Sequence, residues 1–245
     1  MKTAQDEELF EDSFATFDGE MLASENSWSG SYGQSEDGAV DSWRYQYVKR
    51  SIDISCALMM MLVVAIPGLL IASAIVLTSK GPIFYREERI GRYGRPFRIW
   101  KFRSMYANSP HRLSVAGGRP REKVLEWRMQ KRLSDPRVTA VGGFLRRWSL
   151  DELPQLFNIL GGEMSLVGPR PIVESETALY GNWLPYYLEV TPGLSGLWQV
   201  SGRSLIEYGE RAKLDASYVQ SWSLASDMSI LLRTVPTVLR RVGAY

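Results

Sequence analysis

The sequence predicts a mostly helical α+β fold, in which a re-entrant membrane helix precedes a compact cytosolic domain with a small β element and membrane-surface helices. Residues 54–77 contain no charged residue and are long enough to enter a membrane. Residues 83–86 and 97–103 alternate apolar with basic residues, as short strands do. Apolar residues at helical spacing are common in the remainder, which favours helices there.

The first 43 residues differ in composition from the rest of the chain. They contain eleven acidic residues and one basic residue, Lys2, so their formal charge is −10, and the total of +2 leaves +12 for residues 44–245. Their apolar residues are scattered, so the segment cannot bury enough surface to offset the entropy of ordering. We predict a disordered acidic tail at 1–43, which lacks the basic start and apolar core of a secretory signal.

The apolar run at 54–77 predicts a membrane element. About 20 apolar residues are needed to cross the hydrocarbon core of a bilayer, and this run meets that length. The alternative is the buried core helix of a soluble protein. That alternative is disfavoured because helices of soluble proteins normally keep a polar face.

Two features favour a re-entrant helix over a spanning one. Pro67 lies near the middle of the run, where its ring and its missing amide hydrogen bend a helix. Basic residues flank the run on both sides, with Lys49 and Arg50 before it and Lys80 after it. Because basic flanks stay in the cytoplasm, both ends are drawn to the same side. We therefore predict a re-entrant anchor helix at 44–80, kinked at Pro67, and a cytosolic domain at 81–245.

The cytosolic domain is predicted to contain one β-hairpin. A turn at 91–94 joins the two alternating stretches, and Lys101 and Arg103 share one face of the second strand. A loop rich in turn-forming residues follows at 107–121.

Helices are predicted in three later stretches. Residues 122–133 form a basic pattern with one tryptophan, which suits either a membrane-surface helix or an ordinary surface helix. A second helix is expected at 206–222. A third is expected at 228–240, capped by Ser226 and Asp227 and kinked at Pro236.

Composition excludes several kinds of site. The single cysteine, Cys56, rules out an internal disulfide, and its apolar neighbours predict an inert side chain. The single histidine, His111, disfavours a histidine-based zinc site. The positive charge of residues 44–245 suits a nucleic acid, a phosphorylated small molecule or an anionic membrane surface.

The charged segment at 146–171 is the candidate site. It contains the adjacent carboxylates of Asp151 and Glu152, Arg146 before them, and Arg170 between two prolines. The prolines favour an extended backbone around Arg170, and guanidinium groups bind phosphate oxygens through paired hydrogen bonds. Ser149 and Glu152 also match a capping box, which would give the glutamate a structural role.

Two adjacent carboxylates can take different parts in phosphate chemistry. They repel each other when both are ionised, and a hard divalent cation such as Mg²⁺ relieves the repulsion. With Glu152 bound to the metal, Asp151 can attack phosphorus and form an acyl-phosphate. A salt-bridged structural corner is the alternative, because ion-pair networks also gather charges.

Several motifs together resemble the bacterial sugar transferase family, the small monotopic phosphoglycosyl transferases, also called polyprenyl-phosphate glycosyl-1-phosphate transferases. The resemblance covers about residues 45–245 and leaves out the acidic tail. The motifs are KRSID at 49–53, KFRSM at 101–105, SLDELPQ at 149–155, GEMSLVGPRP at 162–171, PGLSG at 192–196 and WQVSGR at 198–203.

The resemblance implies transfer of a sugar 1-phosphate from a UDP-sugar to undecaprenyl phosphate, with release of UMP. The site would lie on the cytoplasmic face of the bacterial inner membrane, and residues 81–245 would be the phosphoglycosyl transferase domain. The chain resembles short exopolysaccharide-initiating members, which implies a UDP-hexose such as UDP-galactose or UDP-glucose. Membrane lipid and downstream glycosyltransferases are candidate partners, whereas no nucleic acid is expected.

The resemblance also implies a role for each residue of the site. Asp151 is expected to be the nucleophile that forms a covalent phosphosugar intermediate, and Glu152 is expected to be the ligand of a Mg²⁺ cofactor. The residues expected to bind the substrates are Lys101, Arg103, Arg146, Arg170, Gln199 and Arg203.

Two other functions fit part of the sequence. A metal-dependent glycosyltransferase would release UDP rather than UMP, but residues 44–245 contain no Asp-x-Asp sequence, its commonest metal-binding arrangement. A non-catalytic membrane adaptor or polynucleotide binder would use the basic surface alone. The central segment contains few aromatic residues for stacking on bases, which disfavours a polynucleotide.

Overall fold

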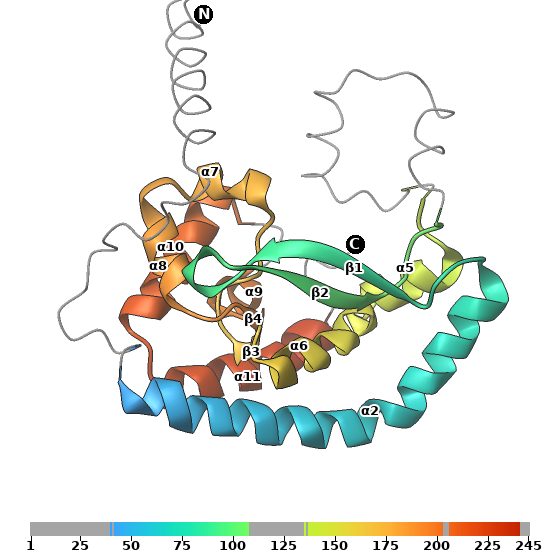
Figure 1. Ribbon diagram of the computed structural model, residues 1–245, viewed down its shortest axis with the longest axis horizontal. Coiled ribbons are helices and arrows are strands. Elements are labelled where there is room, and N and C mark those ends of the chain that lie inside the picture. Colours follow the sequence, from blue (N-terminus) through green and yellow to red (C-terminus); the bar gives the residue numbers. More distant parts are fainter. Residues whose placement is uncertain (1–39, 41, 108–134, 136, 203–205, 241–245) are drawn as a thin grey trace, which may run out of the picture. The chain divides into compact units, whose positions relative to one another are not determined.

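The computed structural model describes residues 40, 42–107, 135, 137–202 and 206–240. Figure 1 shows a helix-rich unit with two short sheets, which confirms the prediction of a mostly helical α+β fold. The predicted tail lies outside the described residues, apart from Val40, Ser42 and Trp43. The predicted helix at 122–133 and nearly all of the predicted loop at 107–121 lie outside them as well.

The described elements follow one another along the chain in this order: η2 (Arg44–Lys49), α2 (Arg50–Thr78), β1 (Phe84–Ile90), η3 (Arg92–Gly94), β2 (Pro96–Phe102), α5 (Ala140–Arg147), η4 (Leu150–Gln155), α6 (Leu156–Gly161), β3 (Ser165–Val167), η5 (Glu174–Glu176), α7 (Thr177–Tyr180), η6 (Gly181–Trp183), α8 (Leu184–Glu189), β4 (Gly193–Ser195), α9 (Leu197–Ser201), α10 (Tyr208–Gln220) and α11 (Leu224–Leu239).

The apolar run forms one long helix, α2, that is bent within its length. Pro67 lies inside this helix, and Figure 1 shows two arms that meet at an angle. The first arm packs on the main core through Ala57 and neighbouring residues, whereas the second packs through Ile75 on a smaller cluster with Phe102 and Leu145. The two arms therefore follow the surface of the same unit on two sides of the bend.

Most of the apolar surface of α2 is exposed. The helix from Arg44 to Thr78 contains an 18-residue window with a mean hydropathy of 2.7, and only 6% of that window is buried. Leu62 and Leu77 are 81% and 84% exposed. A core helix would bury these side chains, so the exposure favours a membrane element.

The predicted hairpin is present and longer than the sequence indicated. β1 and β2 pair antiparallel from Phe84 opposite Phe102 to Ile90 opposite Pro96. The register gives the hairpin two different faces, because residues directly opposite each other share a face. On one face the Arg86 guanidinium stacks 3.4 Å from the centre of the Trp100 ring.

A second, parallel pair of strands organises the main core. β3 and β4 pair in the register Ser165 to Gly193 and Val167 to Ser195. Gly168 follows β3 so closely against the backbone of Thr191 and Gly193 that a side chain would not fit there. This close approach holds the Gly-Pro-Arg-Pro run at 168–171 against the start of β4.

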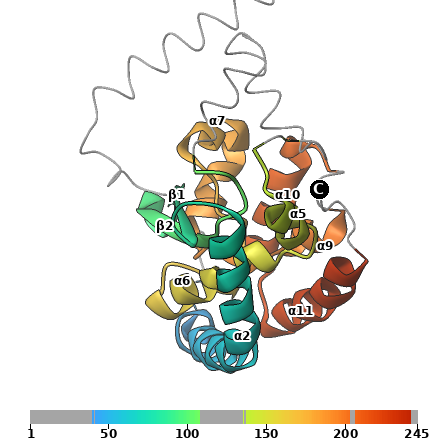
Figure 2. The same cartoon turned by 90° about the vertical axis from the view of Figure 1, so that its right-hand side faces the viewer.

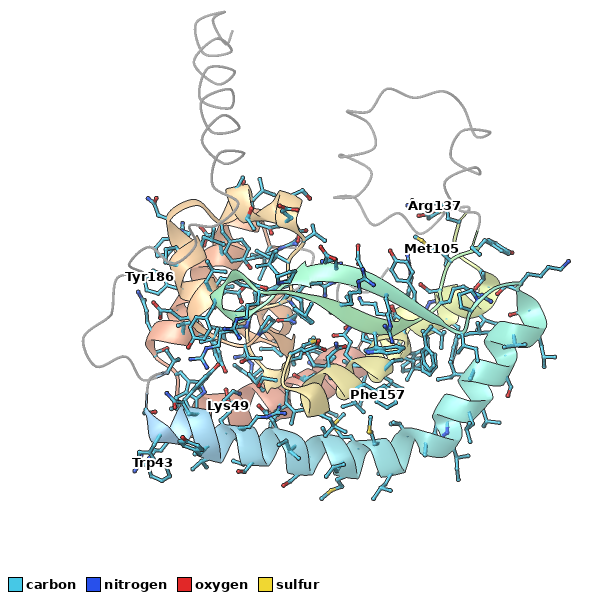
Figure 3. The ribbon with its side chains drawn as sticks, in the orientation of Figure 1. Trp43, Lys49, Met105, Arg137, Phe157 and Tyr186 are labelled. Carbon is cyan, nitrogen blue, oxygen red and sulfur yellow. The ribbon has the colours of Figure 1, made fainter. Side chains whose placement is uncertain are left out.

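The predicted cap of the last helix is wrong. α11 begins at Leu224, four residues earlier than predicted, and its cap is Ser223, whose side chain accepts a hydrogen bond from the Ser226 amide. Asp227 is not a cap but a buried group, whose Oδ2 lies 2.6 Å from the Lys49 ammonium. Figure 3 shows Lys49, the last residue of η2, on the side that faces the other elements. The cap prediction missed this because the partner is 178 residues away in the sequence.

α11 exposes an apolar stripe. Ile230 is buried, whereas the residues on another side of the helix are more than half exposed, at helical spacing: Met228, Leu232, Val235 and Leu239. Figures 1 and 2 show α11 and α2 at the same edge of the unit. The two helices thus present exposed apolar residues on neighbouring surfaces.

Candidate active site

The two central carboxylates lie on a tight helical turn between α5 and α6. Ser149 adopts a left-handed backbone, with φ of 56°, which ends α5 and starts the 3-10 helix η4. The capping box suggested by the sequence does not form, because the Ser149 side chain makes no cap hydrogen bond. Pro154 is accommodated inside η4, and the regular helix α6 begins only at Leu156. Glu152 is therefore not required to close a helix end.

Asp151 is nearly enclosed by protein. Its residue surface is 9% exposed. Burial raises the pKa of the Asp151 carboxyl above its ordinary value, and the adjacent Glu152 raises it further, whereas Lys101 and Arg146 lower it. A carboxylate with little solvation is a stronger base, and the two cations support its ionised form. This environment suits a nucleophile.

Glu152 lies between two cations. Its Oε1 accepts a hydrogen bond from the Lys101 ammonium at 2.9 Å and lies 3.8 Å from Nη1 of Arg170. Lys101 comes from the hairpin and Arg170 from the segment after β3, so three parts of the chain meet at one carboxylate oxygen. The structure thus brings together three of the residues that the sequence singled out.

These side chains line a small pocket. The lining residues are Arg89, Ile99, Lys101, Glu152, Gln155, Arg170, Pro171, Gly193, Leu194 and Gln199. The cations Arg89, Lys101 and Arg170 outnumber the single carboxylate, so the pocket favours an anion. A phosphate group has the charge and the bidentate geometry that guanidinium groups recognise.

Arg89 was missed by the sequence analysis. The predicted strand ended at residue 86, but β1 continues to Ile90 and puts Arg89 opposite Phe97, on the same face as Ile99 and Lys101. Nη1 of Arg89 donates to the Pro171 carbonyl oxygen at 3.1 Å. A strand predicted to continue to residue 90 would have placed Arg89 on the face that carries Lys101.

Arg146 lies in the last turn of α5 and interacts electrostatically with Asp151. Its Nε donates to the Ser104 hydroxyl at 2.8 Å, and α5 approaches Ser104 closely because Gly142 has no side chain. Burial lowers the pKa of Arg146, and the charge of Asp151 raises it. Arg146 and Asp151 therefore interact electrostatically.

The other expected substrate-binding residues lie in different places. Gln199 lines the pocket, and its Oε1 is buried without a hydrogen-bond partner among the described residues. Arg103 is not at the pocket; its Nη2 donates to the Ser79 carbonyl oxygen at 2.7 Å, at the end of α2. Its substrate-binding role stays a prediction. Arg203 lies outside the described residues.

The donor set fits Mg²⁺ in kind. Within the described part of the chain, His, Cys, Asp and Glu side chains form no group of three or more that could hold a metal. Mg²⁺ does not need such a cage, since it commonly uses one or two carboxylates and completes its shell with water and substrate phosphates. Glu152, whose Oε1 already accommodates the Lys101 cation, and the adjacent Asp151 supply that minimum.

Comparison with known proteins gives a family match over most of the chain. A family model described as "Bacterial sugar transferase" matches residues 44–241. An "Undecaprenyl-phosphate galactose phosphotransferase" of Salmonella typhimurium is 46% identical over 201 residues, which cover 82% of this chain and 42% of that protein. The chain thus spans less than half the length of this relative.

Two further relatives differ in length. The "Exopolysaccharide production protein ExoY" of Sinorhizobium fredii is 44% identical over 198 residues, which cover 80% of this chain and 88% of that protein. A "UDP-glucose:undecaprenyl-phosphate glucose-1-phosphate transferase" of Klebsiella pneumoniae is 38% identical over 195 residues, which cover 76% of this chain and 39% of that protein.

Proposed function

Since the chain belongs to the bacterial sugar transferase family, we propose that it transfers a sugar 1-phosphate from a UDP-hexose to undecaprenyl phosphate and so starts exopolysaccharide synthesis. The observation that carries the proposal is the buried Asp151 next to Glu152, which lines an anion-favouring pocket together with Lys101 and Arg170. The names of the relatives point to UDP-galactose or UDP-glucose as donor.

The proposed chemistry has two displacements at one phosphorus atom. A carboxylate oxygen of Asp151 attacks the phosphorus bonded to the sugar, the bond from that phosphorus to the bridging oxygen breaks, and UMP leaves with the electron pair. An oxygen of undecaprenyl phosphate then attacks the same phosphorus and releases the Asp151 carboxylate. The product is undecaprenyl diphosphate sugar, and the enzyme is regenerated.

The cations of the site stabilise the negative charge in both displacements. Arg170 and Lys101 lie where they can bind donor phosphate oxygens, and Arg146 supports the ionised form of Asp151. Mg²⁺, when bound by Glu152, would neutralise further phosphate charge and favour the departure of UMP. Gln199 offers an amide oxygen that can accept a hydrogen bond from the donor.

The proposed location is the cytoplasmic face of the bacterial inner membrane. A lipid acceptor presents its phosphate at the headgroup level, so the catalytic site must lie near the membrane surface. A re-entrant α2 fulfils this requirement, and the exposed stripe of α11 supports it with a second apolar surface at the same edge.

The proposal is tested by the nucleotide that the purified protein releases. We expect UMP from UDP-galactose or UDP-glucose, in a panel of UDP-sugars with undecaprenyl phosphate and Mg²⁺. Release of UDP would contradict the proposal, because it would identify transfer of the sugar without its phosphate. A control lacking undecaprenyl phosphate should release at most one UMP per enzyme molecule.

A further inference from the structure

The start of α2 is held by buried polar contacts as well as by apolar packing. Lys49 pairs with Asp227 of α11, and both side chains are nearly inaccessible to solvent. Asp53, one turn later, is 4% exposed and lies against β3. A helix that served only to anchor the chain in lipid would not need ionised groups buried against the cytosolic domain.

Asp53 accepts hydrogen bonds from the side of β3 that does not pair with β4. Its Oδ1 accepts a hydrogen bond from the Leu166 amide at 3.1 Å, and its Oδ2 accepts one from the Ser165 hydroxyl at 2.8 Å. β4 is the single strand that pairs with β3 in the described part of the chain. The carboxylate thus takes the place of a neighbouring strand and fixes the position of β3.

β3 leads directly into the segment that carries Arg170. The Gly168 amide donates to the Ser195 carbonyl oxygen at 2.9 Å, and the Gly193 amide donates to the Pro169 carbonyl oxygen at 2.7 Å. No flexible linker separates β3 from Arg170, so a shift of the strand must move the guanidinium.

The same turn of α2 also holds the other half of the site. Nη1 and Nη2 of Arg50 donate to the carbonyl oxygens of Ile159 and Leu160, at 2.6 Å and 3.0 Å, near the end of α6. α6 follows η4 without a break, and η4 carries Asp151 and Glu152. One helical turn therefore contacts both chain segments whose side chains meet in the pocket.

We propose that Asp53 is a positioning residue that acts through Arg170: with Arg50, it sets the spacing between the guanidinium of Arg170 and the carboxylates of η4. In this proposal α2 positions the binding site as well as anchoring the chain. This inference rests on the proposed function for the identity of the ligand, a nucleoside diphosphate sugar whose phosphates Arg170 binds.

The test is a double-mutant cycle on the affinity for UDP, measured by calorimetry with the full chain in detergent micelles containing Mg²⁺. We expect Asp53→Ala to weaken UDP binding about tenfold. This effect lies within the range of coupling found between residues of one hydrogen-bond network. Ser165→Ala removes one of the two contacts and should weaken binding in the same direction. In an Arg170→Ala background, Asp53→Ala should change the affinity less than about twofold.

Two variants separate positioning from folding. Asp53→Asn keeps an acceptor for the Leu166 amide and should retain most of the affinity, whereas Ser51→Ala, on the exposed side of the same turn, should retain all of it. Partial unfolding lowers the binding stoichiometry rather than the affinity of the folded molecules. Equal weakening by Asp53→Ala with and without Arg170 would overturn the inference. Because UDP binding needs no turnover, this result is independent of whether UMP or UDP is released.

Discussion

Asp151 and Glu152 occupy different environments although they are neighbours in the chain. Asp151 is buried, and the charge of Arg146 lowers its pKa, whereas Glu152 accepts a hydrogen bond from Lys101 and lies near Arg170. The backbone of η4 directs the two side chains toward different partners. This division is what the proposed chemistry needs, because one carboxylate must attack phosphorus while the other holds cations.

A third carboxylate provides a test of the electrostatics around Arg170. Asp215 is buried on α10, where its Oδ2 accepts a hydrogen bond from the Tyr180 hydroxyl at 2.8 Å. Burial raises the pKa of Asp215 to about 7, although Tyr180 and Arg170 lower it. In the unfolded chain an aspartate has a pKa of about 3.9. The folded protein therefore binds more protons than the unfolded chain between about pH 4 and pH 7.

We expect Asp215 to make the protein less stable as the pH rises through this window. The slope approaches about 1.4 kcal/mol per pH unit and levels off above the folded pKa. Asp215→Asn removes this titration, so its thermal midpoint relative to that of the unmodified protein should be higher at pH 8 than at pH 5. Unfolding in detergent micelles, followed by circular dichroism, measures both midpoints. An equal difference at the two pH values would contradict the assigned pKa.

Local sequence patterns predicted the elements better than their ends. Alternation predicted the hairpin and the face that carries Lys101, but the charged run 86–89 hid the continuation of β1 and with it Arg89. Asp227 resembles a helix cap in the sequence, yet it pairs with a lysine far along the chain. Arg103 was predicted to share a strand face with Lys101, but it follows the end of β2 and its side chain reaches the end of α2. Each difference arises from a tertiary contact that no local pattern contains.

The exposed stripe of α11 predicts contact with lipid. In a Cys56→Ser background, a fluorophore attached to Leu232→Cys reports how deeply this position enters the bilayer of a lipid nanodisc. Lipids with a nitroxide on the acyl chain should quench the fluorophore at residue 232 several-fold more than one at the exposed Arg233→Cys, which lies about 100° away around the helix and outside the stripe. Equal quenching at both positions would show that the stripe does not enter the bilayer.

Both arms of α2, the predicted membrane element, pack on the described unit. Its two arms pack on separate clusters of the same unit, with Pro67 between Ala57 and Ile75. Both flanks carry basic residues, and both continue into the described unit. A helix that crossed the bilayer would have to leave one of these clusters. Composition predicted the long apolar helix and Pro67 predicted its bend, whereas the polar contacts of Lys49, Arg50 and Asp53 depend on segments more than a hundred residues away.

A re-entrant helix has both ends on one side of the membrane. In the Cys56→Ser background, cysteines that replace the exposed Tyr47 and Tyr85 should both react with an impermeant thiol reagent in inverted membrane vesicles. Neither should react in right-side-out vesicles until detergent is added. Labelling of the two positions from opposite sides would establish a spanning helix and would contradict the proposed topology.

The proposed chemistry requires a covalent bond between Asp151 and the phosphosugar. The most direct measurement is the mass of the protein after incubation with UDP-galactose or UDP-glucose and Mg²⁺ without undecaprenyl phosphate. We predict a mass increase of one hexose phosphate, located by peptide mapping on the segment with Asp151, with about one UMP released per adduct. Asp151→Asn should abolish the adduct, whereas the exposed carboxylate variant Glu210→Gln should form it fully. Turnover to UMP by Asp151→Asn, or an adduct on another residue, would contradict the account.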